Sequence, residues 1–305
     1  MTPPRLPDAR RSDLARAKRL EWWTLVWMAS VILVMGLASG TSQAMQTAWI
    51  EDMLSLVPAA VFLIAARFET KPPNARFPFG FTRVNSLGFL IAAVALAGFG
   101  AMLLFDAART LLTGERVTIG AVELFGQTVW AGWPMVAALA YSVVPPVILG
   151  RMKLKPARAL QDKVLHTDAL MNRADWQTGL AGIAGVIGVG YGYWWADAAA
   201  AGVISFSVLH DGIKALRSAA AELVDGAPRA LDGDEIAPDA QALHDALAAS
   251  YPNARIKMRE TGRFIHAVID DAPPGAEADL WPGENDRAWR LASVTQRVGT
   301  GSSPE

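Results

Sequence analysis

The stretch Trp22–Gly40 reads WWTLVWMASVILVMGLASG and contains nineteen residues without a charge. A helix needs about 20 apolar residues to cross the roughly 30 Å hydrocarbon core of a bilayer, so this stretch predicts a membrane span. A cleaved signal peptide is the competing interpretation. Its apolar region has typically about 7–15 residues, and no second span has to follow it. Here the run is longer and further spans follow, which favours a membrane protein.

Five more apolar stretches follow the first one along the chain. The last two are rich in alanine and glycine, and such small residues let membrane helices approach closely. A soluble helical bundle would need polar outer faces, and these segments lack a charged stripe. We therefore predict a mainly α membrane protein with six transmembrane helices, followed by a small α+β cytosolic domain. The further spans are expected at Ala48–Ala66, Ser86–Leu112, Thr128–Gly150, Ala169–Tyr191 and Trp195–Leu216.

The composition of the whole chain excludes several classes of protein. Of 305 residues, 52% are hydrophobic and only 19% are charged, whereas soluble proteins average about 25% charged residues. A net charge of −1 disfavours a nucleic-acid partner. The absence of cysteine excludes disulfides and thiolate metal sites, so that any metal must be bound by oxygen or nitrogen ligands. No nucleotide-binding loop and no serine with an associated base is present, so we do not expect an enzyme.

The distribution of lysine and arginine predicts the orientation in the membrane. Basic residues gather before the first span, between the second and third spans, and between the fourth and fifth spans, whereas the opposite connections hold only Arg116. Positively charged loops stay in the cytoplasm. We therefore predict a multi-pass protein of the plasma membrane, the inner membrane in a bacterium, with both termini in the cytoplasm.

The chain divides into four parts by composition. We predict a basic cytoplasmic segment over 1–20, the transmembrane domain over 21–218, the α+β domain over 219–298 and a disordered tail over 299–305. The segment ELVDGAPRALDGDE marks the end of the membrane domain because its Gly, Pro and acidic residues terminate a helix. Within the cytosolic domain we expect a helix at Asp239–Ser250, hairpin strands at Arg255–Thr261 and Arg263–Asp270, and a second helix at Glu284–Val298.

Acidic residues inside the predicted spans are the functional candidates. Glu51 and Asp52 begin the second span, and Asp175 lies within the fifth. An ionisable group at membrane depth is costly, so it is expected to face a cavity, a partner or an ion path. Glu51 and Ser55 share one helix face at i, i+4, and a second face carries Asp168, Met171, Asn172 and Asp175. If the two spans are neighbours, these faces form a mostly oxygen-lined pocket that suits a divalent cation.

Less specific interpretations stay open for some of these residues. Asp52 and Asp168 could equally be wetted residues at the two membrane interfaces. Asp175 is harder to explain that way, because seven helical residues place it about 10 Å deeper than Asp168. The four histidines are scattered and form no H-x-x-x-H pair, which gives weak support to zinc ligation by imidazole.

Two stretches resemble the cation diffusion facilitator family, also called the cation efflux family. RFETKPPNARFPFGFTRVNSLGFL, where spans two and three join, is similar to a loop of that family. ALMNRADW and the following GYWWADAAAAGVISFSVLHDGIKALRSAAAELVDGAPRALDGDEI are similar to its spans five and six. The resemblance covers about residues 20–235. The later stretch ARIKMRETGRFIHAVIDDA resembles the family's cytosolic domain more faintly.

The resemblance implies a function and a site. Family members are usually homodimers that export divalent cations in exchange for protons, and two residues from each of spans two and five bind the cation. The corresponding positions here are Glu51, Ser55, Met171 and Asp175. Only two of these four are carboxylates, so Asp52 and Asp168, one helical step away, are the candidates to supply further charge.

We therefore predict efflux of a divalent cation, which could be zinc, manganese, iron or another metal, by exchange with protons in a homodimer. No organic cofactor is expected, and the partners are the cation, protons, the lipid bilayer and a second copy of the chain. The alternative is a transport-inactive scaffold or regulatory subunit that keeps the fold. The non-standard residues Ser55 and Met171 motivate this alternative.

Overall fold

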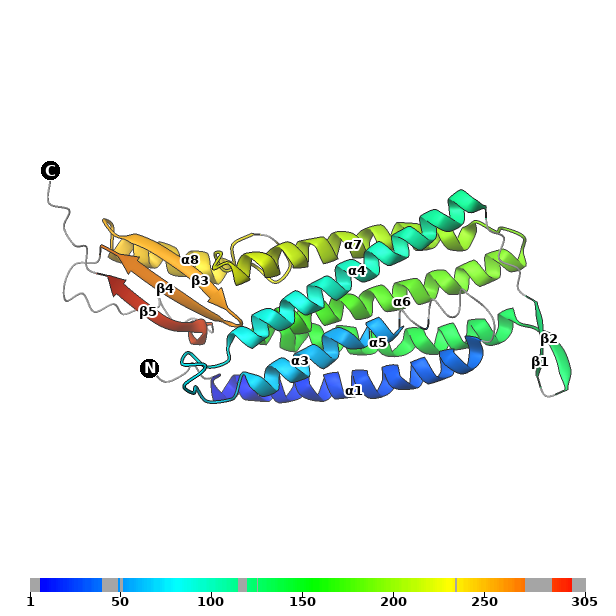
Figure 1. Cartoon of the computed structure of the whole chain (residues 1–305), viewed down its shortest axis with the longest axis horizontal. Coiled ribbons are helices and arrows are strands. Elements are labelled where there is room, and N and C mark those ends of the chain that lie inside the picture. Colours follow the sequence, from blue (N-terminus) through cyan, green and yellow to red (C-terminus); the bar gives the residue numbers. More distant parts are fainter. Residues whose placement is uncertain are drawn as a thin grey trace.

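Long helices packed side by side form an elongated bundle in the computed structural model of the chain (Figure 1). The structure describes residues 6–39, 49, 52–114, 120–124, 126–233, 235–271 and 287–297. The bundle helices within these ranges are α1 (Asp8–Ser39), α3 (Leu56–Phe68), α4 (Arg83–Thr113), α5 (Gly132–Leu160), α6 (Lys163–Gly190) and α7 (Ala196–Leu223). The predicted mainly helical fold with a small sheet near the C-terminus is confirmed. Among the described residues, α4 and α5 are long and apolar enough to cross a membrane.

The start of the predicted fourth span is wrong. Thr128 belongs to strand β2 (Gln127–Trp130), which pairs antiparallel with β1 (Ala121–Leu124) at the far end of the bundle from the C-terminal domain (Figure 1). Gly126 has a φ of 76° in the turn between these strands, a backbone angle that glycine adopts at little cost. The helix that follows therefore begins only at Gly132.

Helices α4 and α7 approach each other closely because glycines lie at their contact. A Cβ atom on Gly100 would lie 2.5 Å from the backbone nitrogen of Leu209, and one on Gly212 would lie 2.6 Å from that of Ala97. Real side-chain contacts are never that short, so only glycine fits at either position. The small residues noted in the sixth stretch thus serve helix packing, as is common in membrane bundles.

The C-terminal domain consists of helix α8 (Pro238–Ser250) packed on a three-stranded sheet of order β3-β4-β5. Strands β3 (Arg255–Thr261) and β4 (Phe264–Asp270) form the predicted hairpin. The predicted helix over Glu284–Val298 is wrong, because a short 3₁₀ turn, η1 (Ala288–Arg290), leads into strand β5 (Leu291–Arg297), which runs parallel to β4. Within β5, Leu291 and Val294 pack against the apolar core of the domain. Burial against an existing sheet decides such ambiguous segments in favour of a strand.

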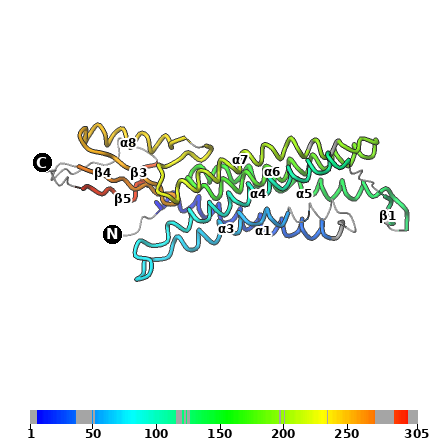
Figure 2. Tube along the Cα trace, turned by 45° about the horizontal axis from the view of Figure 1, so that its top comes forward, coloured from blue at the N-terminus to red at the C-terminus, as the bar shows by residue number. Residues whose placement is uncertain are grey.

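The C-terminal domain lies beyond one end of the bundle rather than alongside it, as both views show (Figures 1 and 2). The start of α1, the connections from α3 to α4 and from α5 to α6, and the end of α7 lie at this same end. We call it the domain end of the bundle. All three basic segments noted in the sequence therefore gather at one end of the molecule.

Candidate functional site

Ser55 and Asp175 meet inside the bundle. Ser55 immediately precedes α3 and is 3% exposed, and Asp175 lies on α6. The Ser55 hydroxyl donates a hydrogen bond to Oδ1 of Asp175 over 2.7 Å. This contact joins two residues 120 positions apart in the sequence. The second and fifth stretches are therefore neighbours in the structure, and an ionisable carboxyl group lies within reach of a second oxygen donor.

Met171 lies one turn before Asp175 on α6 and is fully buried. Its side chain belongs to an apolar cluster with Leu96 and Phe99 of α4 and Val208 of α7. The thioether is therefore packed among apolar side chains of α4 and α7. Thr178 lies one turn after Ala174 and Asp175, and its hydroxyl group donates to the backbone oxygens of both residues.

Only one of the two predicted acids of the second stretch lies within the described residues. Glu51 lies outside the described residues. Asp52 lies within the described residues, and its buried Oδ2 atom has no hydrogen-bond partner among them. Over the ranges that the structure describes, no group of three or more His, Cys, Asp or Glu side chains could by itself hold a metal ion.

Asp168 belongs to a separate buried network that we call the α1–α5–α6 triad, made of Glu21, Lys153 and Asp168. The Lys153 ammonium group pairs with Asp168 and lies 3.0 Å from Oε2 of Glu21. All three side chains are fully buried. Asn172 adds a hydrogen bond of 3.2 Å to Oδ2 of Asp168. Because an ammonium group already neutralises this carboxylate, Asp168 is occupied in the structure as a partner of Lys153.

Sequence reasoning missed Glu21 and Lys153. Glu21 directly precedes the first apolar stretch, and Lys153 follows the fourth one by a few residues. Charges at such positions ordinarily extend toward water. No local spacing relates the two residues, since they lie on α1 and α5. Only the packing of these helices against α6 reveals that they are partners.

A second buried network joins the C-terminal domain to the bundle through the tip of the β3–β4 hairpin. The fully buried Arg263 donates through Nε to Oδ2 of Asp162 over 2.8 Å, and its Nη1 lies 3.1 Å from Oε2 of Glu69. The backbone nitrogen of Gly262 donates to Ser86 over 2.8 Å and to Glu222 over 3.1 Å. The hairpin tip thus contacts the ends of α3, α4, α6 and α7 together.

Charge compensation shapes this junction. Lys163, the first residue of α6, pairs with Glu222 of α7 at 3.2 Å and with Glu260 of β3. Burial raises the pKa of Glu222, and Lys163 opposes that rise. At the solvent-exposed edge, a hydrogen bond from Arg83 lowers the pKa of Asp225, and Arg259 acts in the same direction. Buried ion pairs and hydrogen bonds therefore connect this end of the bundle to the C-terminal domain.

Comparisons with known proteins bear on this arrangement. A family model of the cation efflux transmembrane domain matches residues 23–224. The chain is 21% identical over 228 residues to the manganese efflux system protein MneS of Bacillus subtilis, covering 75% of this chain and 73% of that protein. It is 25% identical over 257 residues to the proposed transporter MamV of Paramagnetospirillum magneticum, covering 83% of this chain and 70% of that protein.

Proposed function

The chain belongs to the cation efflux family, whose members are transporters rather than enzymes, and we propose that it exports a divalent metal cation in exchange for protons. The family match extends from the first bundle helix to the end of the last one. The resemblance noted in the sequence is thereby confirmed. The protein is a membrane protein that moves metal cations, and the cation, the coupling ion and the site are the subject of the proposal.

The proposed topology has six spans, with both termini in the cytoplasm. The membrane of this proposal is the plasma membrane. Its support is that the start of α1 and the C-terminal domain lie at the same end of the bundle, next to the basic connections (Figure 1). Basic segments favour the cytoplasmic face. A homodimer is part of this proposal, as is usual in the family that the sequence resembles.

The contact between Ser55 and Asp175 carries the proposed site. It joins the buried hydroxyl group of the residue before α3 to a carboxyl group of α6. Glu51, one helical turn before Ser55 in the sequence, would add a second carboxylate. Asp52, with its buried unpartnered Oδ2, would extend the negative charge. Hard cations such as Mn²⁺ prefer oxygen donors of this kind to imidazole or thiolate ligands.

Manganese is the first cation to test for a second reason. MneS, a relative over three quarters of this chain, is named as a manganese efflux protein. Exchange with protons would follow from the chemistry of the ligands. A carboxylate can hold a metal ion or a proton, and metal binding requires the deprotonated form. A proton entering from outside would then displace the cation from Asp175.

Reconstitution into vesicles with a metal-sensitive dye and a pH-sensitive dye tests the proposal. We expect Mn²⁺ flux accompanied by opposite proton flux, and loss of at least about 90% of both in Asp175→Asn, because the loss of one charged ligand weakens a cation site by more than tenfold. Ser55→Ala should retain more flux, since it removes a neutral donor. Asp245→Asn, which alters an exposed acid of α8, is the matched control.

Two results would contradict the proposal. Flux that persists unchanged in Asp175→Asn would remove the site from the transport path. Absence of flux in the wild type with every divalent cation would favour the alternative, a transport-inactive scaffold that keeps the fold. Metal flux without proton flux would limit the error to the coupling ion.

A further inference from the structure

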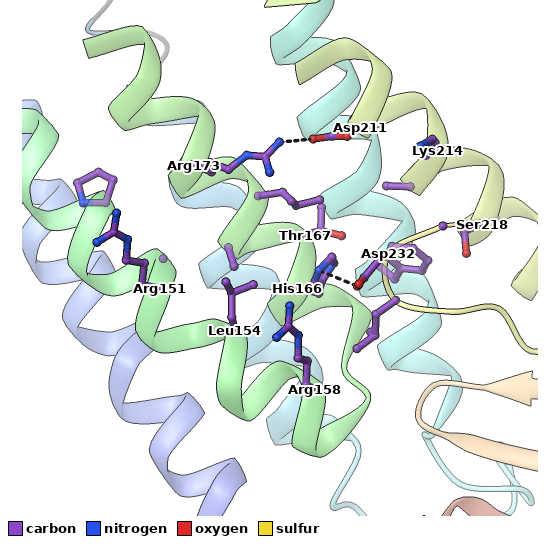
Figure 3. Close-up of a pocket in the computed structure, with 18 of the residues that line it drawn as sticks. Arg151, Leu154, Arg158, His166, Thr167, Arg173, Asp211, Lys214, Ser218 and Asp232 are labelled. Atoms are coloured by element: carbon purple, nitrogen blue, oxygen red, sulfur yellow. Dashed lines mark hydrogen bonds and ion pairs between the residues drawn. The ribbon is translucent and has the colours of Figure 1, made fainter. Parts of the chain in front are cut away.

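A cavity of about 470 Å³ opens between α5, α6 and α7 at the domain end of the bundle (Figure 3). The connection after α7 borders it through Leu231, Asp232 and Gly233. The cavity is separate from the contact between Ser55 and Asp175, because neither residue lines it. The proposed transport mechanism does not use it.

The wall of the cavity carries an excess of positive charge. Four cations line it against two carboxylates, Asp211 and Asp232, without counting His166. Arg173 is paired with Asp211 at 2.9 Å, and Asp232 lies 3.3 Å from Nε2 of His166 (Figure 3). The other three cations have no ion-pair partner within the part of the chain that the structure describes, and they are Arg151, Arg158 and Lys214.

A buried hydroxyl group of the same cavity also lacks a partner. Ser218 is 4% exposed and lines the cavity, and its Oγ atom has no hydrogen-bond partner among the described residues. Buried polar groups in folded proteins are nearly always hydrogen-bonded, so an orphan hydroxyl on the wall of a cavity with excess positive charge indicates a missing acceptor. An anion with several oxygen atoms would accept from the hydroxyl and neutralise the cations together.

Cations at the domain end and apolar side chains deeper in the bundle both line the cavity. Arg158 and Lys214 lie toward the domain end, whereas Pro146, Val147 and Trp176 lie deeper along the bundle. Twelve helical residues separate Arg158 from Pro146 along α5, which corresponds to about 18 Å. A ligand that fills this space needs an anionic head and an apolar tail of that order of length. A phospholipid has this construction, and inorganic phosphate does not.

We propose that this cavity binds the headgroup of an anionic membrane phospholipid, with Arg158 and Lys214 as the cations that contact the phosphate and the upper acyl chain against Val147 and Trp176. Basic pockets between membrane helices on the cytoplasmic side bind anionic lipid headgroups. Arginine presents a planar fork of donors that matches phosphate oxygens. The inference rests on the proposed membrane orientation and not on transport itself.

The test measures the thermal unfolding temperature of the full chain, purified in a neutral detergent, during titration with phosphatidylglycerol, phosphatidylcholine, glycerol 3-phosphate or inorganic phosphate. A ligand that binds only the folded state raises this temperature in a concentration-dependent way. We expect phosphatidylglycerol to stabilise the wild type at a half-saturating concentration at least about tenfold lower than in Arg158→Gln/Lys214→Gln, because two charge-assisted contacts are lost. Phosphatidylcholine should stabilise both proteins weakly and equally.

Lys155→Gln is the matched control, because Lys155 is an exposed cation of the same helix that does not line the cavity. It should respond as the wild type does. Equal responses of the wild type and the double variant to phosphatidylglycerol would overturn the proposal. Stabilisation by glycerol 3-phosphate or inorganic phosphate as strong as that by phosphatidylglycerol would overturn the lipid as the source of the phosphate. Neither outcome depends on whether vesicles transport Mn²⁺, so a failure here is distinguishable from a failure of the proposed function.

Discussion

Replacement of Lys153 by methionine probes the α1–α5–α6 triad most directly. In the wild type one ammonium group lies between two carboxylates, and all three side chains are fully buried. Lys153→Met would leave Glu21 and Asp168 facing each other without a cation. Removal of one partner from a buried ion pair costs about 3–5 kcal/mol, because it leaves an uncompensated charge in a medium of low dielectric constant. We expect Lys153→Met to lie in that range or above it.

The two carboxylates of the triad should respond differently from the lysine. Glu21→Gln leaves the balanced pair Lys153 and Asp168, which Asn172 also contacts, so we expect a loss of less than about 1 kcal/mol. The triple variant Glu21→Gln/Lys153→Met/Asp168→Asn has no charge left to compensate. Replacement of a whole buried ionic cluster by well-packed hydrophobic residues is often neutral or stabilising by about 1–4 kcal/mol, because no charge is left uncompensated. The triple variant should therefore be more stable than Lys153→Met alone.

Thermal unfolding of the purified variants in one detergent, followed by tryptophan fluorescence, measures these differences. For a chain of this size about 1 kcal/mol shifts the midpoint by roughly 2 °C, so Lys153→Met should unfold about 6–10 °C below the wild type. The reasoning would be refuted by a triple variant that is less stable than Lys153→Met. It would also be refuted by a Lys153→Met variant within about 1 °C of the wild type.

Two further predictions concern helix packing and pH. Gly100→Ala should destabilise the bundle by about 1–3 kcal/mol through overpacking against α7. Gly98→Ala should cause no such loss, because its new Cβ atom would meet no atom within 4 Å. Thermal unfolding compares the two variants, and equal losses of stability would contradict the close contact at Gly100. Burial lowers the pKa of His266, and Arg259 and Arg83 add to the effect, so the fold favours the neutral ring, which lies 2.7 Å from Ser293. The stability that depends on this neutral ring is therefore complete above the unfolded pKa of about 6.5 and is lost as the pH falls below it. Unfolding at about pH 7.5 and 5.5 should show a smaller loss in His266→Asn than in the wild type, and equal losses would count against the assignment.

The periodicity and length of apolar stretches predicted most of the helical architecture correctly. They failed where one segment could adopt two structures. Thr128 was expected in a helix and lies in β2, and Leu291–Arg297 was expected in a helix and forms β5. In both cases a neighbouring strand supplies hydrogen bonds that a local pattern does not contain. Strand β5 pairs with β4, which lies much earlier in the sequence, whereas β2 pairs with the adjacent β1 in a short hairpin that the apolar run after it obscured.

The sequence by itself predicted acids at membrane depth, and its family resemblance assigned Ser55 and Asp175 to corresponding positions of two spans. Charge is costly in an apolar run wherever it falls, and that cost is visible without coordinates. Only the tertiary structure decided which charges are already compensated. It assigned Asp168 to Lys153 and Glu21, and it joined Arg263 to the bundle. Compensation depends on the distance between side chains on different helices, and that distance is fixed only when the helices pack together.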